Sequence, residues 1–191
     1  MNTYDAIITR RSIRSYESTP VPEELLDKVV SAGLYAPSGV NLQPWFVVAV
    51  KSSEEMDRVR GIVGEAAEKF RPFLTERFKN NPEVAESTIA FLKTLGGAPA
   101  CILIFRYKPD YGESEEAVSI SIGAAIENML VAARALGLGS ICLTGPVKDC
   151  SAKMNEIYAP DKGRLTAIIP VGYPAEEPTA PARKAGRSIT V

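Results

Sequence analysis

The stretch Ala36-Pro37-Ser38-Gly39-Val40-Asn41-Leu42-Gln43-Pro44-Trp45 runs directly into the apolar residues Phe46-Val47-Val48-Ala49-Val50. The small residues of this polar turn let a ligand approach the backbone, and its Asn and Gln side chains offer donors and acceptors. The apolar run predicts a strand. We therefore expect a ligand-binding loop beside a buried strand. Trp45, the only Trp of the chain, opens that strand, which favours structural packing over stacking on a cofactor ring.

A cluster of positive charge precedes this loop, at Arg10-Arg11-Ser12-Ile13-Arg14. Three guanidinium groups and a hydroxyl within five residues suit a phosphate, which arginine can bind in a bidentate manner. A solvated basic patch paired with acids is the alternative. The formal net charge of −1 gives no general attraction for nucleic acid or an anionic membrane, so the cluster is a local feature. Together the two stretches predict a phosphorylated heterocyclic cofactor.

Composition restricts the chemistry that the side chains can perform. The chain has 191 residues, of which 46% are hydrophobic and 24% are charged, as in a single soluble domain. Histidine is absent, which excludes Ser-His and Cys-His pairs and removes the commonest zinc ligand. We therefore expect no catalytic side chain and no metal, and a cofactor that carries the chemistry. The three cysteines, Cys101, Cys142 and Cys150, lack CxxC spacing and indicate buried free thiols.

The sequence also argues against a location in the membrane. No apolar stretch approaches the roughly 20 residues that span a bilayer, and the first twenty residues lack an apolar signal core. We expect a cytoplasmic protein with a small-molecule substrate, and no membrane or nucleic-acid partner.

Apolar periodicity and turn residues predict interleaved helices and strands in one layered α/β or α+β core. Helices are expected at about 2–9, 23–35, 53–70, 82–95, 119–136 and 148–158, and strands at 46–50, 100–105, 140–143 and 165–171. The nearly all-apolar run 100–105 is typical of a central strand covered on both faces. Residues 119–136 are apolar on nearly all sides, which predicts a helix buried in the core or in a subunit interface. From about residue 175 the Pro- and Ala-rich chain predicts an extended arm.

Four motifs in order give the chain a family resemblance: Arg10 to Arg14, Pro37 to Trp45, the helix end Asn128 to Ser140, and Val171-Gly172-Tyr173-Pro174. With these motifs the sequence resembles the FMN-dependent nitroreductase family from about residue 6 to 184. The resemblance implies an α+β nitroreductase-like fold, with a mixed central sheet flanked by helices, formed by one domain over residues 1–191. It also implies an intertwined homodimer with two FMN sites at its interface.

The resemblance implies cofactor-binding residues in three groups. The FMN phosphate and ribityl chain would be held near both chain ends by Arg10, Ser12, Arg14 and Arg183, with Lys184 as a weaker candidate and Arg11 acting mainly through its backbone. The other subunit would supply Pro37, Ser38, Gly39, Asn41 and Gln43. The backbone of Thr144 and Gly145 would lie near the reactive edge of the flavin. Many relatives carry an acid at the position of Ser121 and Gln at that of Glu127, and neither change removes a phosphate contact.

The function that the resemblance implies is hydride transfer from NAD(P)H through FMN to a nitroaromatic or quinone, by a ping-pong cycle. Reductive dehalogenation, flavin breakdown and a non-catalytic flavin-binding dimer are the alternatives. The acceptor would depend on residues 71–97, where relatives differ most. Five aromatic residues are candidates for the substrate side: Phe70, Phe73, Phe78, Tyr107 and Tyr111.

Overall fold

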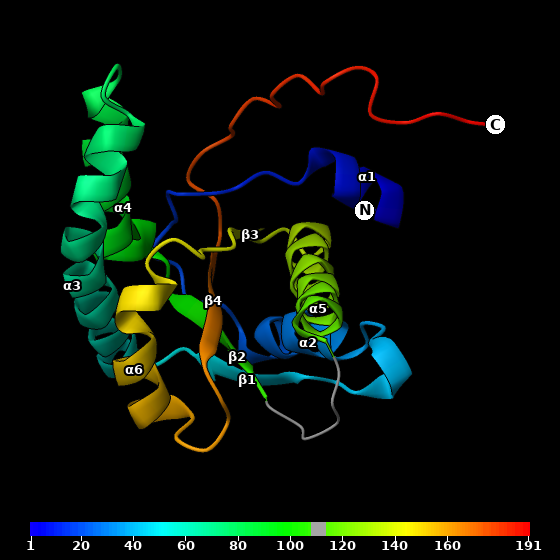
Figure 1. The fold of residues 1–191 in the computed structure, drawn as a ribbon, viewed down its shortest axis with the longest axis horizontal. Coiled ribbons are helices and arrows are strands. Elements are labelled where there is room, and N and C mark those ends of the chain that lie inside the picture. Colours follow the sequence, from blue (N-terminus) through cyan, green and yellow to red (C-terminus); the bar gives the residue numbers. More distant parts are fainter. Residues whose placement is uncertain (108–113) are drawn as a thin grey trace.

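Within residues 1–107 and 114–191, which a computed structural model describes, the chain forms a four-stranded sheet between two groups of helices (Figure 1). The strands are β1 (Trp45–Val50), β2 (Ala100–Arg106), β3 (Gly139–Ser140) and β4 (Leu165–Gly172), in the spatial order β1-β2-β4-β3. The α+β class expected from the sequence is confirmed.

The helices follow the expected order, although α5 begins at Glu115 and not near residue 119 as expected. They are α1 (Thr3–Thr9), α2 (Glu23–Leu34), α3 (Ser53–Arg77), α4 (Pro82–Thr94), α5 (Glu115–Ala135) and α6 (Val147–Tyr158), with short 3-10 turns η1 (Gly39–Asn41) and η2 (Leu95–Gly97). The helix expected to end near residue 70 continues to Arg77. The strand expected at 140–143 pairs as a strand only at Gly139–Ser140, with an isolated bridge from Leu143 to Ile168.

Serine caps fix where the two longest helices begin. The Ser52 side chain accepts a hydrogen bond from the Glu55 backbone N–H (3.3 Å) and so caps the first turn of α3. Ser114 does the same for α5 by accepting from the Ala117 N–H (3.1 Å).

The sheet differs in one respect from the expected mixed sheet. Within the described residues, β1, β2, β3 and β4 pair with one another only in the antiparallel direction. A parallel bridge joins Ser140 of β3 to Ser12. The parallel part is thus provided by the arginine-rich segment, which runs beside the short β3 without forming a regular strand.

β2 lies between β1 and β4 and faces two cores, as a central strand covered on both faces should. Cys101, Leu103 and Phe105 belong to a core with α3, α4 and α6, whereas Ile102 and Ile104 belong to another with α2 and α5. All five are fully buried. Trp45 is also buried in the second core, so its expected packing role is confirmed.

Helix α5 is both a core helix and a partly exposed one. It packs against α1 on one side and α2 on the other, as Figure 1 shows, and buries Val118, Ile122 and Met129. By length and composition it could also cross a membrane, so the expectation that no segment meets these criteria is wrong. Its packing against α1, α2 and the sheet explains the apolar composition instead. Ile120 nevertheless leaves 66% of its surface exposed.

The chain after β4 forms the expected extended arm and lies first against the arginine-rich segment. Glu17 N–H donates to the Tyr173 carbonyl (2.9 Å), and Ala175 N–H donates to the Ser15 carbonyl (2.9 Å). Beyond these contacts the arm rises from β4 and continues past α1 to the C-terminus (Figure 1).

Candidate functional site

Backbone contacts hold the segment Arg10–Tyr16 against the middle of the molecule. Ile13 N–H donates to the Ser140 carbonyl (3.2 Å), and Tyr16 N–H donates to the Gly96 carbonyl (3.0 Å). Gly96 has a φ of +65°, and a Cβ there would overlap the Arg14 carbonyl. The absence of a side chain at Gly96 therefore lets the backbone of Arg14 pack closely against it, which fixes the position of Arg14.

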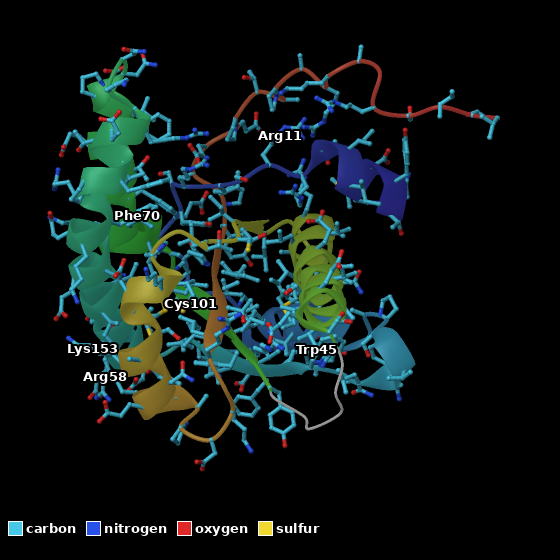
Figure 2. All side chains as sticks on the ribbon, in the orientation of Figure 1. Arg11, Trp45, Arg58, Phe70, Cys101 and Lys153 are labelled. Carbon is cyan, nitrogen blue, oxygen red and sulfur yellow. The ribbon has the colours of Figure 1, made fainter. Side chains whose placement is uncertain are left out.

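A first cavity, of about 310 Å³, lies where α1, the end of α5 and the start of the arm meet. We call it the basic cavity, because three guanidinium-bearing residues line it: Arg10, Arg11 and Arg134. Its remaining lining residues are Thr9, Ile13, Leu138, Gly139, Ser140, Pro174, Glu176, Glu177 and Pro178. Figure 2 labels Arg11 between α1 and the arm. The sequence reasoning missed Arg134, whose one signal is that it is a rare charge on the apolar helix α5.

Neutral acceptors orient two of the three arginines of the basic cavity, and an acid pairs with the third. Arg11 donates to the carbonyls of Ile8 (2.9 Å) and Arg10 (2.6 Å), and Arg134 Nε donates to Thr9 Oγ1 (3.1 Å). Arg10 Nε forms an ion pair with Glu127 (3.2 Å). Neutral acceptors orient a guanidinium without cancelling its charge, so this donor set fits an anion with several oxygen atoms, such as a phosphate.

An acidic side chain from the arm takes the backbone donors beside this cavity. The Glu176 carboxylate accepts hydrogen bonds from the Arg14 and Ser15 N–H groups. The Glu176 carboxylate therefore ties the arm to the segment Arg10–Tyr16. Because it occupies these two backbone N–H groups, an anion in the basic cavity would be bound mainly by side-chain donors.

A second cavity, of about 370 Å³, is lined by four phenylalanines and is called here the aromatic cavity. The residues lining it are Arg14, Phe70, Phe73, Leu74, Arg77, Phe78, Thr88, Phe91, Leu92, Ile141, Cys142, Leu143, Thr144, Gly145 and Pro146. It brings Arg14 together with Thr144 and Gly145, which lie more than a hundred residues away in the sequence.

Helix α3 covers the Thr144–Gly145 turn. A Cβ at Gly145 would lie 3.0 Å from the Phe70 ring, and Phe70 stacks on Phe73 with ring centroids 4.9 Å apart. Figure 2 labels Phe70 where α3 approaches this turn. Phe70, Phe73 and Phe78, three of the five aromatic candidates for the substrate side, thus line the aromatic cavity. Tyr107 lies instead near Lys162, whose Nζ is 5.5 Å from its ring centroid, and Tyr111 is outside the described residues.

The two cavities follow one another along the same pair of segments. Ile13 and Ser140 line the basic cavity, and the next residues, Arg14 and Ile141, line the aromatic cavity. A ligand with an anionic end and a flat end could therefore occupy both. Half-buried Ser12, which bridges to Ser140, lies beside this junction.

The loop 37–43 lies elsewhere in the chain. Gly39 N–H donates to Ser121 Oγ of α5 (3.4 Å), and Gln43 Nε2 donates to Asn41 Oδ1 (3.0 Å). Within the described residues, none of Pro37, Ser38, Gly39, Asn41 and Gln43 lines either cavity. Val40 has a φ of +45° and is 82% exposed, which is a strained conformation for a β-branched residue.

Arg183 and Lys184 lie farther along the arm. Both are exposed, and in the described part of the chain neither lines the basic or the aromatic cavity. The arm nevertheless begins at the wall of the basic cavity, with Pro174, Glu176 and Pro178. The expected contact of Arg183 and Lys184 with a phosphate stays a prediction.

The three cysteines are free, and their environment keeps the thiols protonated. Burial raises the pKa of the Cys101 thiol to about 12 and that of Cys150 to about 11. Cys142 is only half-buried, and desolvation raises its pKa as well. Among the described residues, no group of three or more His, Cys, Asp or Glu side chains could hold a metal ion.

Comparison with known proteins gives this arrangement a family. The sequence profile of the Nitroreductase family matches residues 7–173. The chain belongs to the nitroreductase family. The resemblance carried by the four sequence motifs is thereby confirmed.

Relatives within and around the family carry different activity names. The chain is 29% identical over 181 residues to a protein of Methanothermobacter thermautotrophicus that is provisionally named NADH dehydrogenase/NAD(P)H nitroreductase, covering 93% of this chain and 80% of that protein. It is 30% identical over 187 residues to iodotyrosine deiodinase 1 of Rattus norvegicus, covering 93% of this chain but 64% of that longer protein.

Solved structures of the family superpose over nearly the whole chain. A nitroreductase-type structure from Desulfovibrio desulfuricans in complex with FMN has a TM-score of 0.74 and 26% identity, covering 97% of this chain and 93% of that one. A BluB-like flavoprotein from Clostridium difficile has a TM-score of 0.71 and 26% identity, covering 96% and 95%. A nitroreductase with bound FMN from Desulfitobacterium hafniense, at 20% identity and a TM-score of 0.75, supports the fold alone.

Proposed function

We propose that the protein is a cytoplasmic, homodimeric FMN oxidoreductase, which passes reducing equivalents from NAD(P)H to an electron-poor acceptor such as a nitroaromatic or a quinone. The observation that carries the proposal is the succession of a basic and an aromatic cavity along the segments 13–14 and 140–141. FMN has a phosphate at one end and a flat ring at the other, which is the shape that this succession suits. The FMN-bound nitroreductase structure from Desulfovibrio desulfuricans supports the choice of cofactor.

The donors of the basic cavity fit the phosphate end of FMN. Arg10, Arg11 and Arg134 surround the cavity with guanidinium groups, and Ser12 and Arg14 follow toward the aromatic cavity. Arg183 and Lys184, on the arm that begins at the cavity wall, are proposed to complete this clamp. Glu127 reduces the charge of Arg10 through its ion pair, so we expect Arg11 and Arg134 to contribute more than Arg10.

The residues of the aromatic cavity suit the ring end. When bound, FMN supplies the hydride chemistry that no side chain of this chain can perform. Arg14, which is exposed, brings a positive charge to the edge of this cavity, where it can stabilise negative charge on the bound ring. The backbone of Thr144–Gly145 offers donors at the same place, and Phe70 excludes water above Gly145. Protons can come from solvent, because the chain has no histidine to act as a general base.

A second copy of the chain is proposed to complete the site. The loop 37–43 is anchored to α5 and reaches neither cavity of its own chain. Large apolar side chains are exposed near it, with Tyr35 at 86%, Val40 at 82% and Ile120 at 66%. A surface with such residues favours an interface between subunits, in which the loop of one copy would reach the flavin of the other.

Four measurements test this function. Purified protein should be yellow with flavin absorbance, and anaerobic addition of NADH or NADPH should bleach it. A nitroaromatic or a quinone should then restore the colour. Arg14→Ala should weaken FMN binding and slow the bleaching. Colourless protein that does not bind added FMN contradicts the proposal, whereas bound flavin that neither donor bleaches indicates a non-catalytic flavin-binding dimer.

Reductive dehalogenation is the second candidate, and the likeness to rat iodotyrosine deiodinase 1 favours it. The chain spans only 64% of that relative, so the activity does not follow from the likeness. The reduced holoenzyme should be offered a halotyrosine, nitrofurazone and a quinone in parallel. Release of halide with reoxidation by the halotyrosine alone would favour dehalogenation. The BluB-like neighbour keeps flavin breakdown open, which loss of bound flavin in air would reveal.

A further inference from the structure

The arginines of helix α3 differ in whether an acid neutralises them. Arg58 pairs with Glu55 (3.5 Å) and Glu54 (3.8 Å), and Arg60 pairs with Asp57 (2.6 Å). Arg71 pairs with Glu68 (2.8 Å) and Glu86 (2.5 Å). Arg77, the last residue of α3, has no such ion pair within the described residues.

Arg77 is also the arginine of α3 that lines the aromatic cavity. Phe70, Phe73 and Arg77 follow one another at helical spacing, so they lie along one face of α3. In the described part of the chain, no acidic residue lines this cavity. The only cations on it there are Arg14 and Arg77, and the Arg14 guanidinium donates to the Ser12 carbonyl (3.3 Å). Arg77 thus adds an uncompensated positive charge at the exposed rim of an apolar cavity.

We infer that Arg77 selects aromatic acceptors that carry a carboxylate. This inference rests on the proposed function, because it assigns the substrate class of the same site. The acceptor ring would lie between the bound flavin ring and the phenylalanines of α3, with its reducible group toward the flavin edge near Gly145, and Arg77 would bind its carboxylate at the rim. A guanidinium can bind a carboxylate through two parallel hydrogen bonds, which gives direction as well as attraction.

The position of Arg77 suits this role in two ways. Seven residues separate Arg77 from Phe70, the ring that touches Gly145, which corresponds to about 10 Å along a helix. A benzene ring with groups at opposite ends, met by a long arginine side chain, can cover that span. Because Arg77 is exposed, the carboxylate would keep part of its hydration, and pairing would not incur the full cost of burying two charges.

The test uses the FMN-loaded protein with 4-nitrobenzoate and its neutral analogue 4-nitrobenzamide. The two probes differ in charge and have nearly the same size and shape. KM for each is measured with reduced enzyme, and Kd for each by calorimetry with oxidised holoenzyme. We expect the native protein to prefer 4-nitrobenzoate by about 10-fold in both, a ratio typical of one charge-assisted contact. Added salt should reduce the preference.

Variants separate Arg77 from a general effect of charge. Arg77→Gln should abolish the preference, because KM should rise more for 4-nitrobenzoate than for 4-nitrobenzamide. Arg77→Lys should keep part of it, because the charge remains and the bidentate geometry is lost. Arg58→Gln is the matched control, since it makes the same charge change on the same helix, away from the cavity (Figure 2). It should leave the preference intact.

The outcomes for Arg77 and for the proposed function are distinguishable. Equal affinities for the two probes, or a preference that survives in Arg77→Gln, would overturn the inference even if both compounds are reduced. Failure to reduce either compound contradicts the proposed function, whereas the calorimetric comparison still decides whether Arg77 selects the carboxylate.

Discussion

Arg134 is the one charged residue in the last turn of the apolar helix α5, and it lines the basic cavity. Its Nε donates to Thr9 Oγ1 (3.1 Å), which orients the guanidinium at the wall of the basic cavity. We expect Arg134→Gln to weaken FMN binding by about 10-fold or more, the value of one lost charge-assisted hydrogen bond. Fluorescence titration of apoprotein with FMN measures the change. Lys28→Gln removes a positive charge from the surface of α2 and is the control; equal Kd values for both variants would contradict the assignment.

The Cys101 thiol gives a prediction about alkaline stability. Burial raises its folded pKa from the ordinary 9.0 to about 12, so the unfolded chain loses this proton at lower pH than the native protein. The resulting stability is complete below about pH 9 and is lost as the pH rises toward 12. Above pH 9 each further unit removes about 1.4 kcal/mol from this one group.

Cys101→Ala lacks the titrating thiol and should therefore lose stability less steeply with pH. We expect the gap between the unfolding free energies of native protein and variant to be constant from pH 7 to about 8.5. It should then narrow by about 1–2 kcal/mol by pH 10.5, in urea unfolding experiments. Parallel curves across the whole range would show that the proton on Cys101 does not differ between the folded and unfolded states.

At the scale of elements, one glycine decides how closely α2 packs on α5. A Cβ at Gly33 would overlap the Cγ, Sδ and Cε atoms of Met129, whose side chain is fully buried. Gly33→Ala should therefore destabilise the protein by about 1–3 kcal/mol through overpacking. If the overlap is the cause, Gly33→Ala should cost less in a Met129→Ala background than in the native protein, because the overlapping side chain is then absent.

Gly61 provides the matched control for this prediction. It lies inside α3, and a Cβ there meets no atom within 4 Å in the described structure. Gly61→Ala should stabilise the protein by up to about 1 kcal/mol, because alanine has the higher helix propensity. Thermal unfolding of the two variants measures both the expected loss of stability in Gly33→Ala and the expected gain in Gly61→Ala. Destabilisation of equal size at both positions would contradict the packing argument.

The helices and strands whose bounds depend on local sequence signals could be predicted from the sequence. The bounds that depend on tertiary contacts could not. The Ser52 cap and the apolar run of β2 are local signals, and both elements form as expected. Helix α3 continues past residue 70 despite Pro72 because its last turns pack on α4, where Arg71 pairs with Glu86. The strand after Gly139 is shorter than expected because Ile141 and Cys142 line the aromatic cavity without pairing as a strand, and Leu143 returns to the sheet only through an isolated bridge to Ile168.

The residues of the candidate site also divide into those marked by local sequence signals and those placed by tertiary packing. Arg10 and Arg11 were visible as a local cluster, and Thr144–Gly145 through the family resemblance. Arg77 and Arg134 could not be predicted, because each lies on a helix whose cavity-facing side depends on how the elements pack. The loop 37–43 was predicted as a ligand-binding segment, but a single chain does not bring it to the cavities.

The proposed second copy therefore links assembly to cofactor binding in one prediction. Ile120 is 66% exposed on α5, beside Ser121, which holds Gly39 of the loop. A charge at this position would face solvent in a single chain but would be buried in the proposed interface, where an unpaired charge is costly. Ile120→Asp should therefore dissociate the dimer and weaken FMN binding together, as measured by analytical ultracentrifugation and flavin titration of the same sample.

Ile157→Asp is the control for this experiment, since Ile157 is 41% exposed on α6, in the other group of helices. It should leave both the oligomeric state and the FMN affinity unchanged. The coupling is the decisive result: excess FMN should shift Ile120→Asp back toward the dimer, because a ligand that contacts both copies stabilises their association. A monomeric Ile120→Asp that binds FMN as tightly as the native protein would mean that one chain holds the cofactor without the loop of another.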